Sequence, residues 1–337
     1  MVRLTTLVLS LACSALASPF VTPSDGISLE RRKISDTSVT VQRDVEASVH
    51  ERAISKAITN RAMVCDLTCK ACMAKPAPKK NKGKGKAKSP PRSLVSRGSA
   101  QEERSLHDVE DLWGPGEMGA NEYVMDQIES VAGRDDELDW NLLQHDAVSG
   151  HGSWNERPLR KYIRGLVGCT GIVIVSDKGY WFAHFMETGF LNRGPNWETK
   201  IIKPLQQGSN KFVPPRTLAQ PGGILNKAND VRIYVSTPRT KTSTAESPVL
   251  LYKSKVDELL SHITGRGEPL NGVPVISRGY QTPESEAEAQ EFHNRANGKI
   301  LIEYDNNQLD ADGHQPNPKV RMYRVWLEHK YYEHKFR

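Results

Sequence analysis

The sequence predicts an α/β protein in which helices pack on a mixed β-sheet built around a central hairpin. Residues 168–185 read GCTGIVIVSDKGYWFAHF, where a β-branched run and an aromatic run flank the turn residues Asp-Lys-Gly, as is typical of a hairpin. Further on, strand-like runs alternate with segments of helical spacing. The long N-terminal region, by contrast, is polar and lacks a core pattern, so we expect it to be disordered.

Residues 1–18 have the pattern of a secretory signal peptide. Arg3 is the only charged residue before an apolar run over residues 4–16, and small residues precede Pro19. The run is too short to cross a bilayer, which needs ~20 residues, and no later stretch approaches that length. The sequence therefore predicts a secreted, extracellular protein without a membrane span.

Residues 19–100 are predicted to be a disordered, propeptide-like region with a Lys-rich linker. The dibasic pair Arg31-Arg32 fits propeptide cleavage after Arg32, and it fits an ordinary charged loop equally well. Residues 75–92 carry eight basic side chains and no acids among Pro, Gly and Ala, so they cannot bury a core. Because no aromatic residues are interleaved for base stacking, this tract fits a solvated linker better than a nucleic-acid site.

Three cysteines, Cys65, Cys69 and Cys72, are spaced C-x3-C-x2-C within this region. The same spacing occurs in enzymes that bind a four-iron cluster, which does not suit a secreted chain. One disulfide among the three would leave a thiol to pair with Cys169 or with another chain. A zinc site is the other possibility, but no nearby histidine completes it.

Residues 101–153 form an acidic segment that we expect to be partly ordered. Between residues 102 and 139 there are thirteen acidic side chains and two basic ones. Apolar residues such as Trp113, Val124 and Ile128 would anchor the segment on the domain that follows.

The compact domain is predicted over residues 154–337, with further helices and strands after the hairpin. A helix is expected over residues 197–205, a strand over 231–235 and an amphipathic helix over 250–263 that ends before Gly265. Residues 272–278 are predicted to be an edge strand, because Pro274 cannot donate to a ladder.

The last three elements follow from capping and patterning. Thr282 and Pro283 predict an N-cap and a first-turn proline for a helix that runs to residue 296 and stops at Gly298. Apolar patterning predicts two final strands, over residues 299–304 and 320–327. The order of elements indicates a layered α/β domain.

Cys169 and His184 are the residues best suited to carry chemistry. A two-residue loop at residues 177–178 would place them diagonally adjacent on one face of the hairpin, and a loop extended to Gly179 would separate them. The Asp-Lys-Gly sequence favours the longer loop, in which case the pair meets only if Cys169 lies in the bend before the strand. An imidazole beside a thiol would draw its proton and leave a nucleophilic thiolate. The other interpretation is a buried structural cysteine and an ordinary core histidine.

The segments Gly168-Cys169-Thr170 and Ala183-His184-Phe185 resemble the Cys-His core of the cytotoxic necrotizing factor type of glutamine deamidase, which shares its fold with the bacterial chemoreceptor glutamine deamidases. The hairpin also resembles that of a group of proteins secreted by filamentous fungi. The resemblance implies a hydrolase that releases ammonia from protein glutamine side chains through a thioester on Cys169, with His184 as the base. No residue matches the family's third element, which orients the histidine.

Other candidate residues give weaker signals. Asp305 closes a strand and would suit the orientation of an imidazole, whereas Glu187 is expected to be solvated. Residues 305–313 lack the register of a calcium loop, and four histidines lack ligand spacing with the cysteines, so we predict no metal and no cofactor. The histidines concerned are His293, His314, His329 and His334.

Three functions therefore remain open from the sequence. The leading hypothesis is a secreted cysteine-dependent protein-glutamine deamidase. The second is a non-catalytic secreted effector or interaction protein in which Cys169 is structural and the basic tract binds partners. A cysteine peptidase is the third. Each of them has a protein as substrate or partner.

Overall fold

The structure is a computed structural model of the 337-residue chain. It describes Leu106, Val109 and residues 113–131, 137–138, 146–191, 195–308, 314 and 319–337, all of which belong to one compact unit. The predicted signal peptide, the propeptide-like region with its Lys-rich linker, and Cys65, Cys69 and Cys72 lie outside the described residues.

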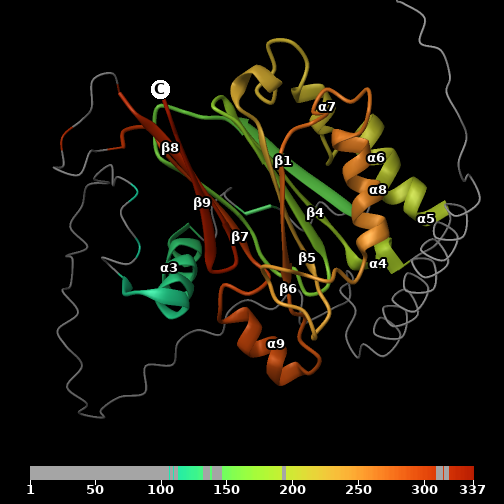
Figure 1. The fold of residues 1–337 in the computed structure, drawn as a ribbon, viewed down its shortest axis with the longest axis vertical. Helices are drawn as coiled ribbons and strands as arrows, with labels where there is room; N and C mark the ends of the chain where they lie inside the picture. The colour runs from blue at the N-terminus through green and yellow to red at the C-terminus, as the bar shows by residue number, and fades with distance from the viewer. Residues whose placement is uncertain are drawn as a thin grey trace, which may run out of the picture. The chain divides into compact units, whose positions relative to one another are not determined.

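The described strands form two sheets (Figure 1). The first contains, in spatial order, β1 (Ala147–Ser153), β4 (Gly179–Phe185), β3 (Thr170–Val175), β5 (Arg232–Pro238) and β6 (Val275–Tyr280). Only its β5–β6 pair is parallel. The second is antiparallel and contains β2 (Leu159–Ile163), β7 (Ile300–Asp305), β8 (Arg321–Leu327) and β9 (Lys330–Phe336). The mixed α/β class with a central hairpin is confirmed, and the division into two sheets is new.

The hydrophobic clusters show how the sheets and helices are layered. One cluster joins Val173 and Phe182 of the first sheet to Ile302 and Val325 of the second, so it lies between the sheets. The alternate residues of β3 and β4 join a second cluster with the helices that follow them. Burial on both faces explains the unbroken apolar run of β3.

Helices cover the outer face of each sheet, and Figure 1 shows α3 on the opposite side of the strands from α5, α6 and α8. The helix α3 (Gly116–Val131) packs against β2, β7 and β8 through Val124, Leu301 and Trp326 among others. The first sheet is covered by α4 (Glu187–Leu191), α5 (Pro195–Trp197), a π-helical turn (Glu198–Ile202), α6 (Lys203–Gln207), α7 (Pro215–Leu218) and α8 (Lys253–Thr264). None of the described helices is both long and apolar enough to cross a membrane.

Three strands lack the apolar pattern by which strands are predicted from a sequence. β1 contains two glycines, two serines and a histidine, β2 is short and basic, and β9 mixes charged and aromatic residues without alternation. β1 also begins before Trp154, where the sequence placed the start of the compact domain, and it pairs along the whole of β4. These strands are held by their ladders and neighbours rather than by their own hydrophobicity.

The boundaries of two predicted elements also differ from those observed. The helix expected to start at Pro283 is α9 (Glu286–His293), whose N-cap is Ser285, because the Ser285 side chain accepts a hydrogen bond from the Glu288 amide. The strand expected at residues 272–278 is β6, two to three residues later, and it lies at the edge of its sheet as Pro274 predicted.

Candidate functional site

The β3–β4 hairpin has a two-residue loop. Ser176 donates its amide to the carbonyl of Gly179 at 2.9 Å, which leaves only residues 177 and 178 outside the ladder. The prediction that favoured a loop extended to Gly179 was wrong. The Gly179 backbone is not left-handed; instead a Cβ there would lie 2.3 Å from the carbonyl oxygen of Gly152. Gly179 is therefore needed for the close approach of β1.

This register places Cys169 and His184 on the same face of the hairpin. Gly171 lies directly opposite His184, and Cys169 precedes Gly171 by two residues. The Cys169 Sγ lies 4.0 Å from the Sδ of Met186, which directly follows β4 and is two residues after His184. Cys169 directly precedes β3, and in this register its side chain is diagonal to that of His184, as the shorter loop predicts. Both side chains have 0% exposure.

Burial sets the charge state of the histidine. It lowers the pKa of His184 to about 3, because the imidazolium would have to exist in a core without solvent. At neutral pH the imidazole is therefore uncharged, and while the core stays closed it is a weak proton acceptor, because the same burial disfavours the imidazolium.

The bend before β3 is held by Tyr280 on β6. Gly168 has a left-handed φ of 101° and donates its amide to the Tyr280 hydroxyl at 2.9 Å. The same hydroxyl donates to the carbonyl of Cys169 at 2.5 Å. One side chain more than a hundred residues away thus fixes the backbone on both sides of the candidate nucleophile. Its role has no local signal in the sequence, because only the parallel β5–β6 pairing brings Tyr280 there.

Apolar side chains cover the Cys169–His184 face. A Cβ at Gly171 would lie 2.5 Å from the Cδ1 of Ile300 and 3.1 Å from the Cδ1 of Leu166. These two side chains therefore occupy the space over Gly171, beside both candidate residues. Leu166 belongs to a tight turn between Gly165 and Gly168, and its amide donates to the Gly298 carbonyl at 3.1 Å.

The two residues considered for orienting the histidine, Asp305 and Glu187, make hydrogen bonds elsewhere. The Asp305 carboxylate accepts hydrogen bonds from the amides of Leu106 at 3.1 Å and Asn307 at 2.8 Å. Glu187 is not solvated, contrary to expectation: it is fully buried and accepts a hydrogen bond from the Tyr252 hydroxyl. The sequence missed this because Tyr252, at the start of α8, is brought over α4 only by tertiary packing.

Comparisons with models of known families, with curated proteins and with solved structures find no match to this chain. The likeness to the glutamine deamidases therefore rests on residues 168–185 alone.

Proposed function

We propose that the protein is a secreted, cysteine-dependent amidohydrolase of the protein-glutamine deamidase type. The observation that carries the proposal is the hairpin register, which makes Cys169 and His184 diagonal neighbours on one face. In the closed core the lowered pKa of His184 makes the imidazole a weak base, so the proposal requires that the site open to solvent before His184 takes the thiol proton.

The reaction follows from these two groups. His184 takes the thiol proton, and the Cys169 thiolate attacks the carboxamide carbon of a glutamine side chain. The imidazolium returns the proton to the departing nitrogen, so ammonia leaves and a thioester remains. His184 then takes a proton from water, whose oxygen attacks the thioester, and the products are a glutamate side chain and the restored thiol.

A substrate reaches the pair only when the Leu166 turn moves. Leu166 and Val167 are both fully buried, and the flanking Gly165 and Gly168 have φ values of 73° and 101°. Glycine enters that region without the steric cost that other residues meet, so this turn has hinges on either side of its apolar residues. Its displacement would uncover the space above Gly171.

The complete burial of Cys169 favours a second candidate function. A fully buried thiol packed against Met186 is also what a structural cysteine looks like. In this second proposal the domain is a secreted effector or interaction protein, and its hairpin only supports the fold.

The rate of Cys169 alkylation against pH, followed on the Cys169 peptide by mass spectrometry, separates the two functions. The full chain is used, because a chain beginning at Trp154 would lack β1. An enzyme should show a thiol pKa below the ordinary ~8.5, and the value should rise in His184→Ala. Equal, slow alkylation in both proteins would support the interaction protein.

Two further variants test access and chemistry. Leu166→Ala should speed the alkylation of Cys169 by about tenfold or more, because it opens the space over Gly171. Leu259→Ala removes an equally buried leucine on the other face of the sheet and should not do so. Ammonia release from a glutamine-containing protein should disappear in Cys169→Ser. Full release by that variant would refute the enzyme.

A further inference from the structure

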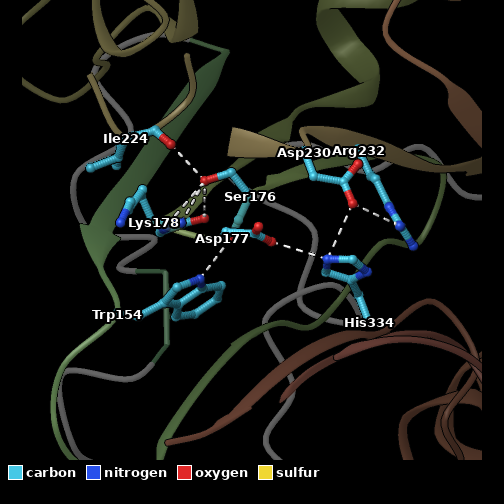
Figure 2. A network of polar contacts seen from close by, with 9 residues as sticks. Trp154, Ser176, Asp177, Lys178, Ile224, Asp230, Arg232 and His334 are labelled. Atoms are coloured by element: carbon cyan, nitrogen blue, oxygen red, sulfur yellow. Dashed lines mark hydrogen bonds and ion pairs between the residues drawn. The ribbon is translucent and has the colours of Figure 1, made fainter. Parts of the chain in front are cut away.

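Three potential metal ligands from distant segments converge at one end of the inter-sheet layer. Asp177 lies in the β3–β4 turn, Asp230 precedes β5, and His334 is on β9 of the other sheet. The His334 Nε2 is 3.0 Å from the Oδ1 of Asp177 and 3.2 Å from the Oδ2 of Asp230. Figure 2 shows both carboxylates directed at the same ring nitrogen.

The turn that carries Asp177 is held rigidly. The Ser176 hydroxyl donates to the Ile224 carbonyl at 2.5 Å and accepts from the amides of Lys178 at 3.0 Å and Gly179 at 3.2 Å (Figure 2). The Trp154 indole donates to the Ser176 carbonyl at 2.7 Å. Such fixed backbone is what keeps a ligand in place before its ion arrives.

The second carboxylate is also held in place. The Asp177 amide donates to the carbonyl of Asn229 at 2.8 Å, which ties the turn to the residue before Asp230. Asp230 has a left-handed φ of 49°, a conformation that non-glycine residues adopt uncommonly and that collects at functional sites. The Arg232 Nη2 lies 3.0 Å from the Oδ2 of Asp230 and forms an ion pair with it.

An independent observation at the same place is the hydroxyl of Tyr323. Its ring lies beside the His334 ring, with centroids 5.2 Å apart. The hydroxyl is buried and has no hydrogen-bond partner among the described residues. Tyr323 lies directly opposite His334 in the β8–β9 ladder, so the two side chains are on the same face of that sheet. A buried hydroxyl without a partner is costly, and a water bound to an ion is a common partner for one.

We propose that Asp177, Asp230 and His334 bind a divalent first-row transition ion, with Zn²⁺ as the best match. Zinc accepts imidazole nitrogen and carboxylate oxygen at ~2.0–2.2 Å, so two ligands of a tetrahedral ion lie about 3.3 Å apart. The separations of 3.0 and 3.2 Å between the His334 Nε2 and the two carboxylates are close to that spacing. Ca²⁺ and Mg²⁺ prefer sites made wholly of oxygen.

The bound ion would join the two sheets. Two of its ligands, Asp177 and Asp230, come from the first sheet, in the β3–β4 turn and just before β5. The third, His334, comes from β9 of the other sheet. Cys169 lies at the opposite end of β3 from Asp177, so the ion takes no part in the proposed thiol chemistry. No metal was predicted from the sequence because its histidines lack ligand spacing with the cysteines, whereas these ligands lie as much as 157 residues apart.

Zinc titration of the full chain by calorimetry, with the thermal midpoint measured in zinc and in chelator, tests the site. The chain should bind Zn²⁺ and show a higher midpoint in zinc. His334→Gln, Asp177→Asn and Asp230→Asn should each weaken this binding by about tenfold or more and abolish the rise. Matched controls are His262→Gln and Asp257→Asn, whose side chains pair elsewhere with Gln206 and Lys253.

Cobalt substitution excludes the cysteines as the source of any signal. Co²⁺ bound by thiolates gives an intense near-ultraviolet charge-transfer band, and Co²⁺ bound by nitrogen and oxygen does not. The part of the Co²⁺ absorption spectrum that disappears in His334→Gln should not include that band. The proposal is overturned when zinc leaves the midpoint of the unaltered chain unchanged, or when all three ligand variants bind zinc as the unaltered chain does. In either case the cluster is a set of polar contacts from His334 to the two carboxylates, without an ion.

Discussion

Gly171 lies directly opposite His184 in the β3–β4 ladder, and the side chains of Leu166 and Ile300 fill the space that a side chain at residue 171 would occupy. The missing Cβ thus lets the second sheet close over the hairpin at the point where Cys169 and His184 are neighbours. The packing of the core and the placement of the candidate site depend on the same glycine.

Gly171→Ala should destabilise the domain by about 1–3 kcal/mol, the usual cost of overpacking a filled core. The new Cβ would lie 2.5 Å from the Cδ1 of Ile300, so that side chain must leave its position. The free energy of unfolding in urea measures the loss.

Ile300→Val supplies the control for this prediction, because it removes the Cδ1 atom that the new methyl group meets. Alone it should cost about 0.5–1.5 kcal/mol. The double variant should lose less unfolding free energy than the sum of the two single losses, by about 0.5 kcal/mol or more. Simple additivity would show that the contact does not exist.

Ser176→Ala should cost about 1–3 kcal/mol, because two turn amides and the Ile224 carbonyl lose one shared partner. Ser261→Ala is the matched control, since its hydroxyl makes one exposed bond within α8 to the carbonyl of Glu258. We expect that variant to stay within about 0.5 kcal/mol of the original protein. Urea unfolding compares the two, and equal effects would argue against the turn network.

The hairpin could be predicted from the sequence because its signals are local. The hairpin can be recognised from a β-branched run, turn residues and an aromatic run without knowledge of any partner strand. The side chains that share a face of β3 and β4 follow from these signals. The predicted loop length was wrong because Gly179 is required by its contact with Gly152 on β1 and not by the turn. The sequence does not reveal this contact, because β1 has no apolar pattern.

The rest of the candidate site lay beyond local signals. Tyr280 reaches Cys169 only through a parallel strand pairing, and His334 reaches Asp177 only because two sheets pack together. Contacts of this kind depend on the arrangement of sheets, which the order of the elements alone leaves undetermined.

Tyr280→Phe should destabilise the domain by about 1–3 kcal/mol, because the Gly168 amide and the Cys169 carbonyl lose a shared buried partner. Urea unfolding measures the change. Tyr304→Phe is the control within the same core, since among the described residues none hydrogen-bonds to its hydroxyl. Should both phenylalanine variants cost the same, the Tyr280 bridge does not hold the bend.

Acid should destabilise the protein through His184. Burial lowers its pKa to about 3 in the folded protein, while an unfolded histidine titrates near ~6.5. Between these values the unfolded state binds more protons, so stability is retained above ~6.5 and lost as the pH falls, by up to about 1.4 kcal/mol per pH unit.

His184→Gln removes the titrating group and should flatten the dependence of unfolding free energy on pH between pH 4 and 6 by most of that slope. The difference between the two proteins isolates His184 from the other acidic and basic groups, which both retain. A histidine NMR titration provides a second measurement, in which the His184 resonances should stay at their neutral positions down to pH 4. Protonation near pH 6.5 in the folded protein would mean that His184 is solvated, and the closed core over the Cys169–His184 face would have to be abandoned.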